Sequence, residues 1–286
     1  MSRGGAIKMS KPPQSTLASR SSNSQMSLIA DRFAEAKREN RALLIGYLTA
    51  GFPTIDRCKS AIKAMIEGGV DLIEVGFPYS DPVMDGPVIQ RASEIALANK
   101  VGAKEVFEIV SSSSVPTLVM SYWNPIEKYG VSTFVKELKA CGGSGVITPD
   151  LTIEESDEWI TETKKADLDS VYVVAPSTTD ERLEMVTSEC RGFVYAASLM
   201  GVTGARSAIS GAAESLVARV RNVTETPVSV GLGVSNGQQA AEIAKYADGV
   251  IVGSAFIKLL LEAKDESQAN QSLKSLAQEL SKAVRR

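Results

Sequence analysis

LIEVGFPYSDPVMDGP, at residues 72–87, joins an apolar run to a loop that is rich in carboxylates. The apolar run is typical of a buried β-strand, and Asp81 and Asp85 follow it among three prolines. Glu74 lies inside the run, where an ionised carboxylate is costly to bury unless it is paired, neutralised or used. We therefore expect a buried strand that leads into a loop of chemically active side chains.

The alternation of short apolar strands with amphipathic helices continues on both sides of this stretch. Helices between strands rich in β-branched residues indicate right-handed βαβ units and a parallel sheet. The predicted helices include IDRCKSAIKAMIEG, VSTFVKELKACG, IEESDEWITETKK, GQQAAEIAKYAD and DESQANQSLKSLAQELSKAVRR. The predicted strands are LLIGYLTAG (43–51), DLIEVGFP (71–78), TLVMSYWN (117–124), GVITPD (145–150), SVYVVAP (170–176), FVYAAS (193–198), PVSVGLGV (227–234) and GVIVGSAF (249–256).

Eight such units in about 240 residues predict an α/β fold, a closed (β/α)₈ TIM barrel. An open doubly wound sheet is the alternative, but no G-x-G-x-x-G follows the first strand. The segment SLIADRFAEAKREN (27–40) predicts an extra N-terminal helix, with Ile29, Phe33 and Ala36 on one face. No linker rich in Pro, Gly or Ser interrupts residues 43–285, so we expect one barrel domain over residues 27–286.

Residues 1–26 are predicted to be a disordered tail. The first thirty residues hold eight serines and four basic residues but no acidic one. A transit peptide shares this composition, whereas the apolar core of a secretory signal is missing. We expect a cytoplasmic protein, or a plastid protein if the tail is a transit segment.

Composition excludes several classes of function. The net charge of −3 gives no reason to expect nucleic acid or an anionic membrane as partner, and no apolar run approaches 18 residues. Cys58, Cys141 and Cys190 are widely spaced, which favours three reduced thiols over a zinc site or disulfides. The chain has no histidine, so acid/base chemistry falls to Glu, Asp, Tyr, Lys or a cofactor.

In a barrel of this kind, the active site lies at the carboxyl ends of the strands. Glycine-rich GLGV and VGSA end the seventh and eighth predicted strands, where barrels often bind phosphate through backbone N–H groups. Gly233, Gly253 and Ser254 are therefore candidates to hold a phosphorylated small molecule. The polar residues at the other strand ends are Glu74, Asp81, Asp85, Asn124 and Asp150.

Taken together, these residues resemble the tryptophan synthase α-subunit family. The family pattern reads approximately L-I-E-x-G-x-P-[FY]-S-D-P-x-x-D-G-P, and residues 72–87 fit it throughout. The resemblance covers about residues 28–285 and leaves the tail outside. Further matches are GYLTAGFP (46–53), NP (124–125), ITPDL (147–151), GVTGAR (201–206), GLGV (231–234) and GSA (253–255).

The resemblance implies retro-aldol cleavage of indole-3-glycerol phosphate to indole and glyceraldehyde 3-phosphate. It implies Glu74 as the acid/base and Asp85 as the anion at the indole N–H, with no metal and no cofactor in this chain. Tyr195 matches a tyrosine that packs beside the glutamate and substrate. The remaining family positions are Thr203 in a mobile closing loop and Gly204, Gly233, Gly253 and Ser254 at the phosphate.

The resemblance also implies a partner, a pyridoxal-phosphate β subunit in an α2β2 heterotetramer that receives the indole. Asp81 and Pro78 lie in the S-D-P loop, which in the family communicates with that partner. A stand-alone lyase that releases free indole, a non-catalytic activator of β and another phosphate-binding barrel of the pathway remain alternatives.

Simpler interpretations of the single carboxylates also stay open at this point. Glu74 could form an ion pair with a barrel Lys or Arg, and Asp81 and Asp85 could be turn residues. The three carboxylates could also bind Mg²⁺.

Overall fold

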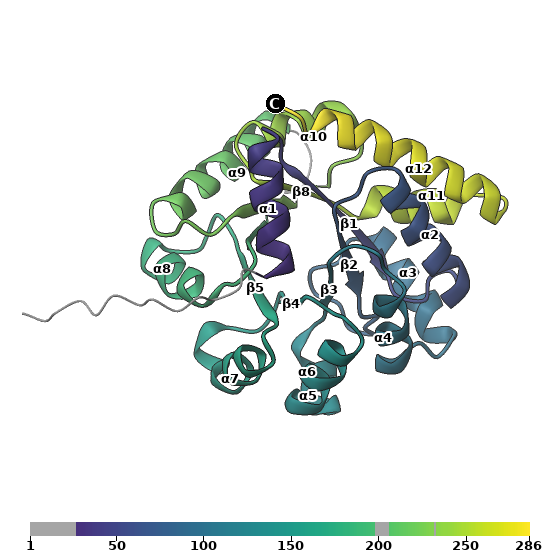
Figure 1. Cartoon of the computed structure of the whole chain (residues 1–286), viewed down its shortest axis with the longest axis horizontal. Helices are drawn as coiled ribbons and strands as arrows, with labels where there is room; N and C mark the ends of the chain where they lie inside the picture. The colour runs from purple at the N-terminus through teal and green to yellow at the C-terminus, as the bar shows by residue number, and fades with distance from the viewer. Residues whose placement is uncertain (1–26, 198–205, 232) are drawn as a thin grey trace, which may run out of the picture.

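The computed structural model describes residues 27–197, 206–231 and 233–286, with residues 206–210 described as backbone only. Eight parallel strands close into a barrel in the order β1 to β8, and helices surround it as a ring (Figure 1). Because the sheet is closed, the structure confirms the predicted (β/α)₈ barrel and excludes the open doubly wound sheet. The predictions for the 1–26 tail, Thr203 and Gly204 lie outside the described residues.

All eight predicted strands are present, and most are shorter at their carboxyl ends than predicted. The last predicted residues that the structure describes lie in βα loops or, at 123–124 and 254–256, in the next helix. This is the end of a barrel where functional side chains are placed. The strands are β1 (Leu43–Thr49), β2 (Leu72–Gly76), β3 (Thr117–Met120), β4 (Gly145–Thr148), β5 (Asp169–Val174), β6 (Val194–Ala197), β7 (Val228–Gly231) and β8 (Gly249–Val252).

The helices that cover the strands include every predicted one and several more. Their bounds are α1 (Leu28–Arg38), α2 (Ile55–Glu67), α3 (Pro87–Ala98), α4 (Ala103–Ser111), α5 (Trp123–Tyr129), α6 (Val131–Ala140), η1 (Ile153–Glu155), α7 (Asp157–Ala166), α8 (Asp180–Glu189), α9 (Arg206–Arg221), α10 (Gly237–Ala244), α11 (Ser254–Glu262) and α12 (Glu266–Ala283).

The prediction for residues 117–124 was wrong at its carboxyl end. Strand β3 ends at Met120, and helix α5 begins at Trp123 after an extended N-cap at Tyr122. Pro125 fits this arrangement, because a proline is tolerated in the first turn of a helix but removes a donor from a strand. Asn124 therefore lies in the first turn of a helix that follows the strand.

Helix α1 covers the amino-terminal end of the barrel, as Figure 1 shows, and confirms the predicted extra helix. Ser27 caps it, since its hydroxyl accepts a hydrogen bond from the Ala30 N–H at 3.2 Å. Phe33 packs on Phe193 of the barrel interior with ring centroids 5.8 Å apart. The buried cluster at this end comprises Ile29, Phe33, Ala36, Leu43, Ile45, Leu72, Leu118, Ile147, Val171, Phe193 and Ile251.

The interior changes character toward the carboxyl ends of the strands. Tyr47 of β1 pairs in register with Glu74 of β2, and Val173 of β5 pairs with Tyr195 of β6. Polar side chains thus join the apolar ones at this level, which leaves this end of the barrel suited to hold a ligand.

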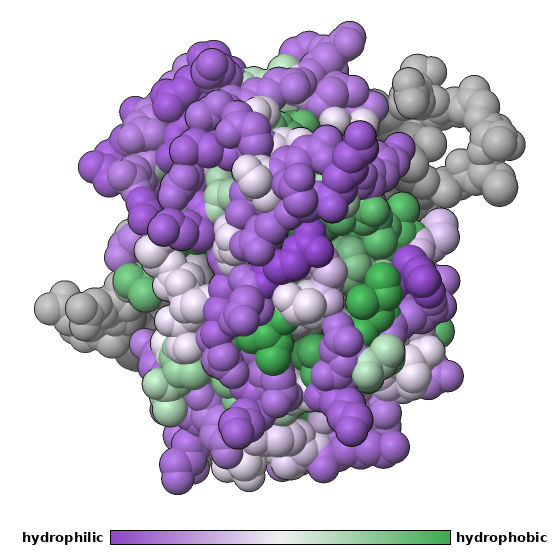
Figure 2. Space-filling model, turned by 90° about the vertical axis from the view of Figure 1, so that its right-hand side faces the viewer, coloured by the Kyte–Doolittle hydropathy of each residue, from purple (hydrophilic) through white to green (hydrophobic). Residues whose placement is uncertain are grey.

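The outer surface is mainly hydrophilic on the side that carries α2, α3 and α12, with apolar side chains at separate places among the polar ones (Figure 2). Large apolar side chains exposed in the loop between β2 and α3 are Val83, at 81%, and Met84, at 40%. No helix in the described part of the chain combines the length and apolar character needed to cross a membrane.

Candidate active site

A cavity of about 490 Å³ opens at the carboxyl ends of the strands. It brings together Glu74 and Asp85, the two carboxylates predicted from the sequence to be catalytic. Every strand except β4, together with the segments after β2, β7 and β8, contributes to its wall. The lining residues are Tyr47, Glu74, Met84, Asp85, Gly86, Pro87, Ile89, Met120, Val173, Tyr195, Ala197, Gly231, Gly233, Ile251, Gly253 and Ser254.

Glu74 is fully buried in the middle of β2, between Tyr47 of β1 and Leu118 of β3. Neither carboxyl oxygen has a hydrogen-bond partner among the described residues. None of these residues therefore forms the alternative ion pair between Glu74 and a Lys or Arg of the barrel. Burial raises the pKa of Glu74 from its ordinary 4.5 to about 8. The group therefore carries a proton at neutral pH and can deliver it to a ligand in the cavity.

Asp85 reaches the same cavity from the loop before α3. It is half-buried, and burial raises its pKa from 3.8 to about 6, which leaves it mainly ionised at neutral pH. Its backbone carbonyl accepts a hydrogen bond from the Gln90 Nε2 at 2.9 Å. Two carboxyl groups in one cavity thus differ in protonation because their burial differs, which permits different roles.

Two tyrosines complete the wall around Glu74. Burial and the charge of Glu74 raise the pKa of Tyr195 well above its ordinary value, so its hydroxyl stays protonated. The rings of Tyr47 and Tyr195 each pack against a glycine, where a larger residue would clash. A Cβ at Gly76 would collide with the Tyr47 hydroxyl, and one at Gly231 would lie 3.0 Å from Tyr195 Cε1. The site prediction omitted Tyr47, although its register opposite Glu74 on the neighbouring strand could have identified it.

The predicted phosphate positions Gly233, Gly253 and Ser254 also line the cavity. Gly253 is the N-cap of α11 and provides no side-chain cap, so the first N–H groups of that helix are left for a ligand. Gly233 has a φ of 69°, a left-handed conformation that favours glycine. Ser254 lines the cavity beside them. This wall suits an anion, because the helix N-terminus carries partial positive charge.

The residues predicted to couple to a partner occupy different depths of the loop after β2. Asp81 is exposed, whereas Pro78 is buried. The role of both residues in coupling to a partner stays a prediction. The described residues contain no group of three or more His, Cys, Asp or Glu that could hold a metal ion.

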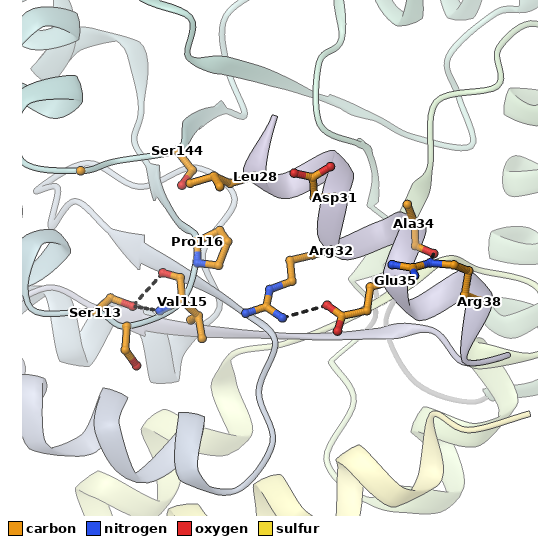
Figure 3. Close-up of a pocket in the computed structure, with 12 residues that line it drawn as sticks. Leu28, Asp31, Arg32, Ala34, Glu35, Arg38, Ser113, Val115, Pro116 and Ser144 are labelled. Atoms are coloured by element: carbon orange, nitrogen blue, oxygen red, sulfur yellow. Dashed lines mark hydrogen bonds and ion pairs between the residues drawn. The ribbon is translucent and has the colours of Figure 1, made fainter. Parts of the chain in front are cut away.

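A larger hollow of about 950 Å³ lies at the other end of the barrel, between α1 and the segments that precede β3 and β4 (Figure 3). Its charged groups contact their own neighbours. Arg32 donates to Glu35 at 2.9 Å, and Arg38 donates to the Ala34 carbonyl at 3.4 Å. The Ser113 hydroxyl in the same wall donates to the Val115 carbonyl at 3.1 Å. The chemistry therefore points to the carboxyl-end cavity.

Known proteins resemble this chain over most of its length. The family model described as tryptophan synthase alpha chain matches residues 33–285. The tryptophan synthase alpha chain of Streptomyces avermitilis is 53% identical over 262 residues, which cover 90% of this chain and 95% of that protein. The alpha chain of Thermobifida fusca is 52% identical over 266 residues, covering 91% of this chain and 98% of that protein.

Solved structures give the same result. A chain of Mycobacterium tuberculosis tryptophan synthase superposes with a TM-score of 0.85 at 46% identity, covering 92% of this chain and all of that one. Tryptophan synthase subunit alpha of Legionella pneumophila superposes with a TM-score of 0.83 at 31% identity, covering 91% and 99% of the two chains. The chain belongs to the tryptophan synthase alpha chain family.

Proposed function

We propose that this chain is a lyase that cleaves indole-3-glycerol phosphate by a retro-aldol reaction, as the α subunit of tryptophan synthase in tryptophan biosynthesis. The observation that carries the proposal is the unequal pair of carboxyl groups in one cavity. Glu74 is buried and protonated, and Asp85 is half-buried and ionised. Cleavage needs a proton donor at C3 of the indole ring and an anion at the ring nitrogen.

The reaction begins with proton transfer from Glu74 to indole C3. The ring then carries positive charge at its nitrogen, and the Asp85 carboxylate accepts a hydrogen bond from that N–H and stabilises the charge. Next, the hydroxyl on the adjacent carbon returns a proton to Glu74. The bond between C3 and that carbon breaks, and its electron pair neutralises the ring. Indole leaves with the new hydrogen on C3, and the other product is the aldehyde glyceraldehyde 3-phosphate.

The cavity walls fit the two ends of this substrate. Met120, Val173 and Ile251 offer an apolar surface to the indole, and Tyr195 adds a protonated hydroxyl beside Glu74. The phosphate is assigned to the wall formed by Gly233, Gly253 and Ser254. Thr203 and Gly204 are assigned to the loop that closes over the site, as the family resemblance implies.

The proposed chemistry uses proton transfers between carboxyl groups and substrate, so this chain needs no cofactor of its own for it. Pyridoxal phosphate is assigned to a β subunit, in an α2β2 heterotetramer. Support comes from the loop between β2 and α3, where the exposed Asp81 lies near the exposed apolar Val83 and Met84. We assign the contact with β to this loop and the enzyme to the cytoplasm.

An assay of indole release tests the function. Purified chain is incubated with indole-3-glycerol phosphate, with and without β subunit, and both products are measured. Equal amounts of indole and glyceraldehyde 3-phosphate are expected, with faster release when β is present. Full activity without β would support the stand-alone lyase. A chain that cleaves nothing under either condition, yet accelerates β, would support the non-catalytic activator and overturn the proposal.

A further inference from the structure

We infer that Tyr122 is a positioning residue that holds Asp85 at the indole N–H, through a hydrogen bond to the backbone of the loop that carries Asp85. This inference rests on the proposed function, because it assigns a support to one of the two proposed catalytic groups. The two proposed catalytic groups are held in the structure in different ways. Glu74 is fixed within a strand, whereas Asp85 lies on the long loop between β2 and α3 and needs a separate support.

The support is the Tyr122 hydroxyl. It accepts a hydrogen bond from the Met84 N–H at 3.0 Å, directly before Asp85 in the chain. Burial raises the pKa of Tyr122, and the nearby charge of Asp85 raises it as well. Hydrogen bonds from the N–H groups of Met84 and Asp85 lower it. The hydroxyl thus lies at the peptide that connects these two residues. A contact to backbone fixes where the Asp85 side chain begins, without using the carboxylate itself.

Tyr122 is held firmly enough to serve as an anchor. It is only 6% exposed, and its ring packs against Tyr79 with centroids 5.2 Å apart. Its own carbonyl accepts a hydrogen bond from the Ser121 hydroxyl at 2.8 Å. A buried aromatic ring that is held by such contacts loses little further freedom when its hydroxyl binds, so it can position the loop that carries Asp85.

Residues at the ends of neighbouring strands help to hold Tyr122 in place. The Asp150 carboxylate, after β4, accepts a hydrogen bond from the Trp123 N–H at 2.8 Å and so holds the first turn of α5. In the same turn, the Asn124 amide donates to the Tyr79 hydroxyl at 3.2 Å. The βα loops of β2, β3 and β4 are therefore tied together around Tyr122. This gives Asn124 and Asp150, which the proposed reaction does not use, a role in placing Asp85.

Tyr122→Phe removes the acceptor and keeps the ring that packs on Tyr79. The matched control is Tyr129→Phe, which removes a hydroxyl that donates to the exposed Glu137 at 2.6 Å, away from the cavity. With wild-type activity established in the indole-release assay, we expect kcat about tenfold lower in Tyr122→Phe and unchanged in Tyr129→Phe. We also expect the low-pH limb of kcat/KM to move below about 6, because the freed loop lets the Asp85 carboxyl reach water.

A binding measurement separates positioning of Asp85 from a general loosening of the fold. Two inert ligands are compared, an indole-alkyl phosphate and its benzothiophene counterpart, which lacks the N–H donor. Tyr122→Phe should weaken the indole ligand several-fold and the benzothiophene ligand hardly at all. Equal weakening of both, or wild-type kcat and pH profile in Tyr122→Phe, would overturn the inference. An inactive wild-type chain would instead overturn the proposed function.

Discussion

Replacing Glu74 by Gln should make the protein more stable at neutral and alkaline pH. Glu74 is fully buried and its two carboxyl oxygens have no hydrogen-bond partner among the described residues. The native protein therefore holds a proton on Glu74 up to a pKa of about 8, whereas the unfolded chain releases it near 4.5. Between these two pH values, rising pH favours the unfolded chain.

The size of the effect follows from that interval. The wild type has the full stability contribution of Glu74 below pH 4.5 and loses about 1.4 kcal/mol for each pH unit up to about 8. The Gln variant has no proton to lose and keeps its stability across the interval. The free energy of unfolding of Glu74→Gln should thus exceed that of wild type by an amount that grows by about 5 kcal/mol over the interval.

Urea unfolding followed by far-ultraviolet circular dichroism measures this difference at several pH values between about 5 and 9. Subtracting wild type from variant cancels the titration of all other groups. Glu127→Gln, which replaces a carboxylate by an amide at an exposed position of α5, is the matched control. A difference for Glu74→Gln that depends on pH no more than the control difference would refute the claim that Glu74 is buried with a proton.

Three further results are expected. The pH profile of kcat/KM should be bell-shaped, falling below about 6 as Asp85 gains a proton and above about 8 as Glu74 loses one; a flat profile across this range would contradict the assignment. Gly233→Ala should raise KM for the phosphorylated substrate about tenfold, because the φ of 69° strains alanine where the phosphate binds; unchanged KM would argue against this site. Phe33→Ala should lower the free energy of unfolding by about 3–5 kcal/mol in urea titrations, since Phe33 packs on Phe193 under the barrel; a loss below about 1 kcal/mol would contradict that packing role.

Most of the barrel could be predicted from the sequence because its signals are local. Eight short apolar runs alternate with amphipathic segments, and each run became a strand in the same order. The two carboxylates could be located because the barrel places the strand ends together and the 72–87 pattern is specific. The apolar character of the run around Glu74 also indicated the direction of its pKa, which burial alone then determined.

What could not be predicted depends on contacts between distant segments. The apolar run 117–124 carries no local signal that β3 ends at Met120, since its end is set by the extended Tyr122 and the helix after it. The burial of Pro78 and the anchor from Tyr122 to Met84 arise only when loops from different units meet.

The most direct test of the account is single-turnover cleavage of indole-3-glycerol phosphate by Glu74→Gln, with β subunit present. The variant should fold, bind the substrate and release indole at least about 10²–10⁴-fold more slowly than wild type, because it has no proton to give to C3. Cleavage at a rate near that of wild type would contradict the central claim that Glu74 is the acid and base of the reaction.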